Sequence, residues 1–213
     1  MHILIPVNRL DQAKSRLSEL LTSTERRQVA LLTLESVIAA ARSIGRVHVL
    51  SADTSIEAMG DNFIAEDPRL RGLNAQLEAA IRQMGKEERL TILHADLPLA
   101  TAERLKLFFD SAPPTPSVTA VRSADGGTNV MLLSPPTGFP LAYGPKSFDK
   151  HVDAATSNGM AFNRYRNAEL ELDLDSPNDV AELFLYSAAK ETPVVKYLRT
   201  LMLTTRAAWP TDE

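Results

Sequence analysis

The sequence contains no cysteine, which excludes disulfide bonds and metal sites built from thiolates. Positive charge is also scarce: the formal net charge is −4, so the chain has no general basic surface for DNA or RNA. No apolar run approaches the roughly 20 residues that a membrane-spanning helix needs, and no signal-peptide pattern follows Met1. We therefore expect a cytoplasmic protein that binds neither nucleic acids nor membranes and meets any phosphate with a local basic patch.

The residues that are present suffice for a globular core. The chain has 213 residues, of which 44% are hydrophobic and 23% charged, which is the composition of one ordinary domain. No internal repeat or low-complexity linker divides it. Even the proline-rich stretch at 113–116 precedes a segment that we expect to join the same sheet. We predict a single domain covering residues 1–213.

Short apolar segments alternate with amphipathic ones along the chain. The predicted strands are 2–7, 46–50, 62–65, 90–95, 117–121, 129–133 and 170–174. The predicted helices are 11–21, 24–44, 72–84, 101–111, 147–158, a helix that begins at 176–177, and 192–203. This alternation predicts an α/β fold: a mainly parallel central sheet with helices on both faces. Such sheets bind ligands at the carboxyl ends of their strands.

Three cations, Arg9, Lys14 and Arg16, fall within eight positions of the loop after the first strand. We expect them at the start of a helix, where free N–H groups and the helix dipole also favour an anion. A solvated charged turn is the plain alternative, and charge alone does not exclude it. The position after the first strand of an open sheet favours the anion site. The loop lacks the Walker pattern GxxxxGK[ST].

Acidic residues end two of the predicted strands. Asp96 follows the apolar strand 90–95, and a carboxylate there can face a cleft and hold a hard cation such as Mg²⁺. Asp173 and Asp175 are two apart on a predicted strand, so both face the same side and could reach one metal. The plain alternatives are that Asp96 caps a turn and that Asp175 helps to begin the next helix. We interpret His94 as a packed histidine, not as a metal ligand.

Two glycine-containing segments are further candidates for binding a ligand. At 125–129, two glycines allow a ligand to approach the backbone, and Thr128 offers a hydroxyl. At 143–148, Gly144 and Ser147 lie at the start of a predicted helix. A hairpin turn and an ordinary capped helix are the respective alternatives.

Taken in order, the motifs PVxRLxxAKSRL, GLN, ADLPL, GGTN, YGxxSF and LDxDSPxDV resemble the 2-phospho-L-lactate guanylyltransferases of coenzyme F-420 biosynthesis over residues 3–185. AKSRL, ADLPL and LDLDSP are shared more loosely with nucleotidyltransferases related to molybdenum-cofactor guanylyltransferase, whereas GGTN with YGPKSF is the specific pair. The resemblance implies a Rossmann-like, GT-A-like nucleotidyltransferase fold. It also implies transfer of GMP from GTP to a phospho acid, with release of pyrophosphate. The acid would be 2-phospho-L-lactate, phosphoenolpyruvate or 3-phospho-D-glycerate.

The resemblance also implies a role for each motif. Catalysis would involve Lys14, Arg16 and Asp96. Mg²⁺ would be bound by Asp96, Asp173 and Asp175, and the triphosphate by Lys14 and Arg16. The segment Gly72 to Asn74 would form part of the guanine and ribose site. The phospho acid would bind in a pocket formed by Thr128, Gly144 and Ser147. This sequence departs from the family pattern at two places. Asn8 stands where many members have Lys, and the segment Val121-Arg122-Ser123 stands where members often have Pro-Asp-Arg. The second segment is expected near the acid, so the sequence does not fix which acid is used.

Two other functions fit the same fold. One is a nucleotidyltransferase for another phosphorylated or phosphonate acceptor, although residues 8–16 lack the Gly-rich loop that is usual in those classes. The other is a catalytically silent nucleotide-binding protein, against which the three aspartates argue. The apolar run 194–203 either packs on the core or forms the surface of a homodimer.

Overall fold

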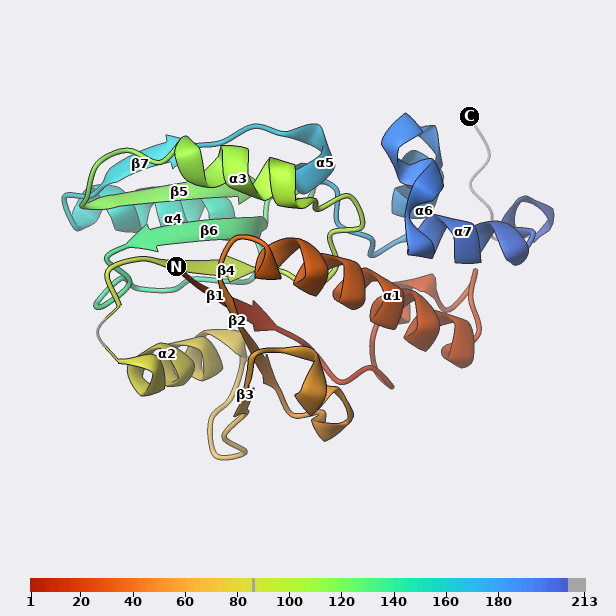
Figure 1. Ribbon diagram of the computed structural model, residues 1–213, viewed down its shortest axis with the longest axis horizontal. Helices are drawn as coiled ribbons and strands as arrows, with labels where there is room; N and C mark the ends of the chain where they lie inside the picture. The colour runs from red at the N-terminus through yellow and green to blue at the C-terminus, as the bar shows by residue number, and fades with distance from the viewer. Residues whose placement is uncertain (86, 207–213) are drawn as a thin grey trace.

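The computed structural model describes residues 1–85 and 87–206. Seven strands form one sheet in the order β3-β2-β1-β4-β6-β5-β7 (Figure 1). The strands are β1 His2–Pro6, β2 Arg46–Ser51, β3 Asn62–Ala65, β4 Leu90–Leu93, β5 Ser117–Arg122, β6 Thr128–Ser134 and β7 Ala161–Arg164. Only β6 runs antiparallel to its neighbours β4 and β5, and every other neighbouring pair is parallel. The prediction of a mainly parallel sheet is confirmed.

Helices cover both faces of this sheet. They are α1 Ser23–Arg42, α2 Leu73–Met84, α3 Ala102–Asp110, α4 Ser147–Ser157, α5 Ala168–Glu171, α6 Pro177–Leu185 and α7 Pro193–Thr200. Helix α1 begins with a capping box, in which Thr22 and Glu25 each accept a backbone N–H of the other residue. Helix α6 begins in the same way, with Ser176 as its cap and Pro177 in its first turn. These local signals explain why both helices start where they do.

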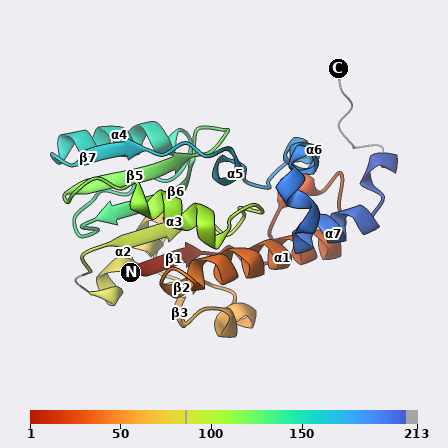
Figure 2. The same ribbon diagram turned by 45° about the horizontal axis from the view of Figure 1, so that its top comes forward.

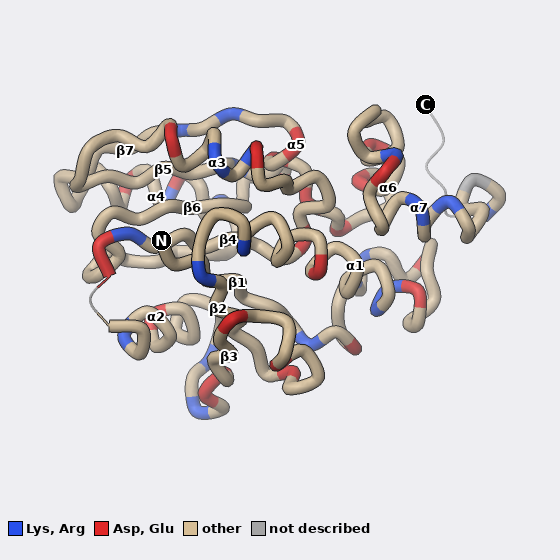
Figure 3. The backbone as a smooth tube through the Cα atoms, viewed as in Figure 1, with Lys and Arg blue, Asp and Glu red and all other residues tan. Residues whose placement is uncertain are grey.

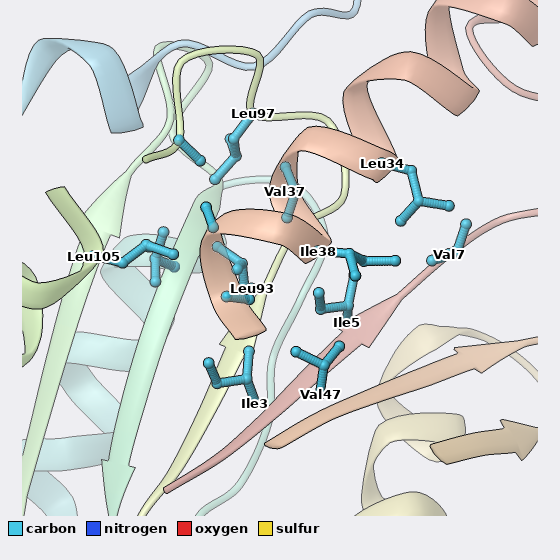
Figure 4. Packing of buried hydrophobic residues seen from close by; sticks show 14 of the residues in the cluster. Ile3, Ile5, Val7, Leu34, Val37, Ile38, Val47, Leu93, Leu97 and Leu105 are labelled. Atoms are coloured by element: carbon cyan, nitrogen blue, oxygen red, sulfur yellow. The ribbon is translucent and has the colours of Figure 1, made fainter. Parts of the chain in front are cut away.

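Alternation along the strands divides the core into two layers. Ile3 and Ile5 of β1 are fully buried on the face covered by α1 and α3, where they pack with Val37 of α1 (Figure 4). Leu4, between them, is buried on the other face with Leu77 of α2. Complete burial of such a side chain stabilises the fold by about 1.5–3 kcal/mol. The sheet is therefore rigid where its loops leave it.

A third cluster of buried residues joins the C-terminal helices to α1. Val194, Leu198 and Leu203 are buried against Leu17 and Val29. Figure 2 shows α6 and α7 beyond the end of the sheet, next to the start of α1. Of the two alternatives for the run 194–203, packing on the core is the one observed. The helix itself ends at Thr200, earlier than predicted, and a short 3₁₀ turn, η4 (Leu203–Thr205), follows it.

The predicted helix at 11–21 is wrong, because only a 3₁₀ turn, η1 (Ser15–Leu17), forms there. Lys14 adopts φ 56° and ψ 39°, which is left-handed and breaks a helix. Its side chain is thereby directed to two acidic residues, so tertiary contacts override the helical spacing of the apolar residues. The cationic loop consequently has no helix start, and its affinity for an anion must come from its side chains.

The predicted strand at 170–174 is also wrong. Residues 168–171 form the short helix α5, and an extended segment that belongs to no strand follows it. The side-chain amide of Asn129 donates to the carbonyl oxygens of Leu170 (3.1 Å) and Glu171 (3.0 Å), so these groups bond to a side chain in place of a neighbouring strand. Strand β7 was not predicted, since its four residues are half-buried or exposed and lack a clear apolar alternation.

Surface charge is mixed, as the composition suggests. Figure 3 shows Lys and Arg interspersed with Asp and Glu along the chain, without a continuous basic stretch. In the described ranges, no helix combines the length and apolar character needed to cross a bilayer.

Candidate active site

A cavity of about 610 Å³ opens at the carboxyl ends of β1, β3 and β4. Its wall is formed by the loops after these strands and by the segment before α6, which together contribute Asn8, Lys14, Arg16, Glu66, Gly72, His94, Asp96 and Asp175. This is the edge at which an open parallel sheet is expected to bind a ligand. Of the residues predicted to bind nucleotide, Lys14, Arg16 and Gly72 line the cavity.

Lys14 lies between two of the predicted metal ligands. Its Nζ donates to Asp96 Oδ2 at 3.1 Å and to Asp175 Oδ1 at 2.9 Å. The lysine side chain is only 7% exposed. The backbone N–H of Leu174 donates to the carbonyl oxygen of Asp96 at 3.0 Å, which fixes the segment 173–175 beside the end of β4. Residues that are 79 positions apart in sequence thus meet at one end of the cavity.

The three acids, hereafter the carboxylate cluster (Asp96, Asp173 and Asp175), carry more negative charge than Lys14 can neutralise. Burial would raise the pKa of Asp96, but the Lys14 ammonium outweighs that effect and holds it below its usual range. Burial, and next the charges of Asp96 and Asp175, raise the pKa of Asp173 to about 7. Asp96 Oδ1 is buried and has no hydrogen-bond partner in the described part of the chain.

These features fit a further cation. Asp96 Oδ1 has no hydrogen-bond partner among the described residues, and the carboxyl group of Asp173 lies in the field of two other carboxylates. Oxygen ligands of this kind suit a hard ion such as Mg²⁺. Within residues 1–85 and 87–206, however, no three acidic or histidine side chains gather closely enough to hold one metal together. Lys14 Nζ is held between Asp96 and Asp175, so the ligand set of three aspartates stays a prediction. A site with one or two carboxylates agrees with the usual habit of Mg²⁺.

Arg16 supplies unpaired positive charge to the cavity, as does the exposed Arg71. The side chain of Arg16 is exposed on the wall and makes no hydrogen bond or ion pair with the residues that the structure describes. Asn8, the departure from the usual lysine, also lines the cavity, and its side-chain oxygen accepts the N–H of Arg9 at 2.9 Å. Arg16 is therefore available to an anion, whereas Lys14 is already bound to carboxylates.

The antiparallel direction of β6 explains how the second half of the site is assembled. Because β6 runs against β4, its first residue, Thr128, lies near the end of β4. The N–H of His94 donates to the carbonyl oxygen of Asn129 at 3.0 Å, which joins the two strands at this point. Thr128, with Ser147 3.1 Å away, therefore lies near the end of β4, which Asp96 follows, but none of Thr128, Gly144 and Ser147 lines the cavity, and their contact with the acid stays a prediction.

Thr128 and Ser147 belong to a chain of buried hydrogen bonds that begins at His151. His151 Nε2 accepts the N–H of Ala142 at 3.0 Å, so this nitrogen carries no proton. Nδ1 is then the donor to Thr128 Oγ1 at 3.0 Å. Burial lowers the pKa of His151 to about 4, which keeps the ring neutral. Thr128 Oγ1 and Ser147 Oγ are 3.1 Å apart and either hydroxyl can donate, so one hydroxyl hydrogen of this pair has no acceptor within the described residues.

The turn at 143–148, hereafter the Gly144 turn, carries Ser147 and begins α4. Gly144 has φ 130° and Lys146 has φ 56°, both in the left-handed range. Within the described residues, the N–H groups of Gly144 and Lys146 donate to no acceptor. Together with Ser147 they form a set of unpaired donors at a helix start, which favours an anion.

Asn74 connects the Gly144 turn to α2. Its amide nitrogen donates to the carbonyl oxygen of Tyr143 at 3.0 Å, and its amide oxygen accepts the N–H of Tyr143 at 2.8 Å. This amide therefore holds the turn and does not line the cavity. His94 stacks on the Tyr143 ring, with centroids 5.3 Å apart, so it is packed as predicted. Contact with a nucleotide stays a prediction for Asn74.

Several residues of this site escaped the sequence reasoning. His151 lies four residues after Ser147 on the predicted helix, so helical spacing could have placed both on one face. Asn129 follows the predicted Thr128 directly. Arg122, a departure from the family pattern, lies beside Gly126. A Cβ atom added at Gly126 would come within 3.1 Å of the guanidinium of Arg122. No signal in the sequence indicates that contact.

The family described as "Guanylyl transferase CofC like" matches residues 1–211. The chain belongs to this family. A phosphoenolpyruvate guanylyltransferase of Rubrobacter xylanophilus is 36% identical, over 84% of this chain and 91% of that protein. A 2-phospho-L-lactate guanylyltransferase of Methanothermobacter thermautotrophicus is 32% identical, over 98% and 94% respectively.

Membership of the CofC-like family makes the protein a nucleotidyltransferase. Its fold is shared with a protein of Desulfovibrio desulfuricans whose structure was solved as a candidate nucleotide-diphospho-sugar transferase. The TM-score is 0.76, over 93% of this chain and 94% of that one. With 16% identity the likeness concerns the fold alone, and it confirms the predicted nucleotidyltransferase architecture.

Proposed function

We propose that the protein transfers GMP from GTP to the phosphate of a three-carbon phospho acid and releases pyrophosphate, as a step of coenzyme F-420 biosynthesis. The observation that carries this proposal is the meeting of Lys14, Asp96 and Asp175 at one end of a cavity, whose wall residue His94 stacks on Tyr143 of the Gly144 turn. GTP would occupy the cavity, and the acid would bind at Thr128, Gly144 and Ser147.

The acceptor side supports an anion with both carboxylate and phosphate groups. Unpaired N–H groups of the Gly144 turn, the spare hydroxyl hydrogen of the Thr128–Ser147 pair and the nearby guanidinium of Arg122 all favour negative charge. The related proteins carry the names of two acceptors, 2-phospho-L-lactate and phosphoenolpyruvate, which share these groups. Arg122 stands in a segment that departs from the family pattern, so the acceptor of this chain needs direct measurement.

The reaction needs no protein nucleophile. A phosphate oxygen of the acid attacks the α-phosphorus of GTP in line, a new P–O bond forms, and the bond to the β-phosphate breaks. The acceptor phosphate has its second pKa near about 6, so it is largely dianionic at neutral pH and requires no general base.

Repulsion between two polyanions is the main obstacle. Two unit charges about 4 Å apart repel by roughly 4 kcal/mol at an effective dielectric constant of about 20. Arg16 is free to approach the triphosphate, and Lys14 offsets charge at the carboxylate cluster. Mg²⁺, held by Asp96 with Asp173 or Asp175, would neutralise phosphate charge when bound. The Gly144 turn and Ser147 would orient the acid for in-line attack.

The substitution Asp96→Asn tests the nucleotide side of the proposal. We expect pyrophosphate release to fall by at least about 100-fold, because the amide cannot replace a carboxylate at the phosphate-binding end. The exposed Asp153→Asn is the matched control, and its turnover should equal that of the wild type. Melting curves of both variants report whether the fold is retained. Near-normal turnover of Asp96→Asn would remove Asp96 from the site.

A parallel assay identifies the acceptor. Pyrophosphate release from GTP and Mg²⁺ is measured with 2-phospho-L-lactate, phosphoenolpyruvate and 3-phospho-D-glycerate. We expect one of them to give the highest kcat/KM. Binding of GTP without turnover on any of the three would contradict the proposed transfer and favour a silent nucleotide-binding protein or a different acceptor.

A further inference from the structure

Glu66 is a carboxylate of the cavity wall that the proposed chemistry does not use. It follows β3 directly and is half-buried. Its side chain accepts no hydrogen bond and forms no ion pair within residues 1–85 and 87–206. Burial raises the pKa of this carboxyl. A partly desolvated acceptor without a donor is costly unless a ligand supplies one.

The position of Glu66 separates it from the carboxylate cluster. The strand order places β3 three neighbours away from β4, so their carboxyl ends lie about 14 Å apart at about 4.8 Å per strand. Both ends nevertheless open into the same cavity. With the triphosphate at Lys14 and Arg16, the nucleoside end of GTP would extend toward Glu66.

The loop that carries Glu66 is held in place before any ligand binds. The N–H of Glu66 donates to the carbonyl oxygen of Ser51 at 3.1 Å. The side-chain oxygen of Gln76 accepts the N–H of Asp67 at 2.9 Å. The side-chain nitrogen of Gln76 donates to the carbonyl oxygens of Asp67 (2.8 Å) and Leu70 (3.3 Å). Such a loop can present a side chain in a fixed orientation.

The surroundings of Glu66 suit a flat, partly apolar ring. Leu70 and Leu73 line the cavity on either side of Arg71 and Gly72, where the leucines offer apolar surface and the exposed guanidinium of Arg71 a planar face to a base. Gly72, between them, has φ 80°, and a side chain added there would meet nothing within 4 Å, so space is open in front of the backbone. A base can therefore approach the loop closely.

We propose that the carboxylate of Glu66 accepts hydrogen bonds from N1–H and the 2-amino group of guanine and so selects guanine over adenine. This inference rests on the proposed function, because it assumes that GTP occupies the cavity. Guanine presents two adjacent donors on this edge, which match the two oxygens of a carboxylate. Adenine has an unprotonated N1 at the corresponding position, which would face the carboxylate with a second acceptor. Ribose hydroxyls are the competing donors, and the test separates them.

The test compares four nucleotides on three proteins. KM and kcat are measured for GTP, ITP, 2′-deoxy-GTP and ATP with the wild type, Glu66→Gln and the control Glu57→Gln, an exposed glutamate that does not line the cavity. ITP lacks only the 2-amino group. We expect the wild type to prefer GTP to ITP by about 10-fold or more, as loss of a charge-assisted hydrogen bond implies. Glu57→Gln should match the wild type.

In Glu66→Gln, the KM for GTP should rise about 10-fold or more while that for ITP rises less, so that the preference for GTP over ITP shrinks. The KM for the phospho acid should not change. An unchanged ratio of GTP to ITP in Glu66→Gln would overturn the inference. So would equal losses for GTP and ITP accompanied by a lost preference for GTP over 2′-deoxy-GTP, since the carboxylate would then hold the ribose.

Failure of the proposed function would look different. In that case the wild type would release no pyrophosphate from GTP with any phospho acid. Isothermal titration of the same nucleotides then provides the comparison, with Kd in place of KM, and the same ratio of GTP to ITP decides the role of Glu66. Melting curves with the three proteins show whether Glu66→Gln retains the fold.

Discussion

Ser147 shows how a buried hydroxyl can be kept ready to donate. The N–H of Ala142 holds the His151 imidazole in one tautomer, so that its other nitrogen donates to Thr128, which shares a hydrogen bond with Ser147. The two hydroxyls share one hydrogen bond, so one hydroxyl hydrogen is left over. A donor with no acceptor among the described residues is suited to an anionic substrate.

The substitution Ser147→Ala should raise the KM for the phospho acid by about 10-fold or more, because one hydrogen bond to a charged group is lost. The KM for GTP should stay within about twofold. Steady-state kinetics with each substrate varied in turn measures both. Equal effects on the two substrates would mean that Ser147 does not belong to the acid pocket.

His151 should act through Thr128 and Ser147 as a positioning residue. His151→Phe removes the donor to Thr128 and should raise the KM for the acid as Ser147→Ala does. His151→Asn places an amide N–H near the position of Nδ1, and should restore most of the affinity for the acid. A KM for the acid that is unchanged in His151→Phe would contradict the positioning role of His151.

Single residues were predictable where a motif has one chemical purpose. Asp96, at the end of a buried strand, lies on the cavity wall as expected. The partner of Asp96 was not predictable, because the sequence gives no reason for Lys14 to bind carboxylates in preference to phosphate. That choice depends on the left-handed backbone at Lys14, which side-chain contacts across 82 positions impose.

At the scale of elements, Asn129 determines where the end of α5 lies. Its amide nitrogen donates to both Leu170 and Glu171, two residues before Asp173. Strand β6 thus holds the segment that carries part of the carboxylate cluster. A similar arrangement occurs far from the site, where the amide nitrogen of Asn163 donates to the backbone oxygen (3.0 Å) and the hydroxyl (3.3 Å) of Ser111.

These two asparagines form a matched pair for a test. Asn129→Ala should lower the free energy of unfolding by about 1–3 kcal/mol, since one buried and one partly buried carbonyl oxygen lose their donor. It should also raise the Mg²⁺ concentration needed for half-maximal pyrophosphate release, because Asp173 is no longer fixed. Asn163→Ala should destabilise the fold comparably without changing the Mg²⁺ requirement. Urea denaturation and Mg²⁺ titrations measure the two effects; identical Mg²⁺ curves would contradict the role of Asn129.

Elements followed from sequence where local signals and tertiary packing agree. Helices α1 and α6 have capping boxes that need no distant partner; α6 begins at the predicted residue and α1 one residue before the predicted one. The predictions of a helix at 11–21 and a strand at 170–174 were wrong because distant side chains bond to polar groups of these segments. Aspartates of the carboxylate cluster bind Lys14, and the amide of Asn129 donates to the carbonyl oxygen of Leu170. The antiparallel direction of β6 was equally hidden, although it is what places Thr128 next to Asp96.

For the molecule as a whole, the carboxylate cluster is a stability cost that function explains. Burial and the neighbouring charges raise the pKa of Asp173 from 3.8 to about 7. The folded state thus binds this proton more tightly than the unfolded state. Above pH 7 the ionised carboxylate destabilises the fold, and the cost disappears as the pH falls from 7 toward 4.

The substitution Asp173→Asn should therefore make the protein more stable while removing activity. Without divalent cations at pH 8, we expect the free energy of unfolding to rise by about 2–4 kcal/mol, because burial raises the pKa of Asp173 from 3.8 to about 7 and solvent relieves part of that cost. At pH 4 the gain should vanish, because the wild-type carboxyl is then protonated in the fold. Urea denaturation at the two pH values measures this, and the exposed Asp153→Asn should show no gain at either.

Addition of Mg²⁺ separates a strained functional carboxylate from one that is merely buried. If Asp173 helps to hold the cation, Mg²⁺ stabilises the wild type by mass action and leaves Asp173→Asn nearly unchanged, so the difference at pH 8 narrows. A variant that gains no stability at pH 8 in the absence of metal would show that the carboxylate is not strained. A difference that Mg²⁺ does not alter would place the cation elsewhere, because a group that shares the metal must feel its charge.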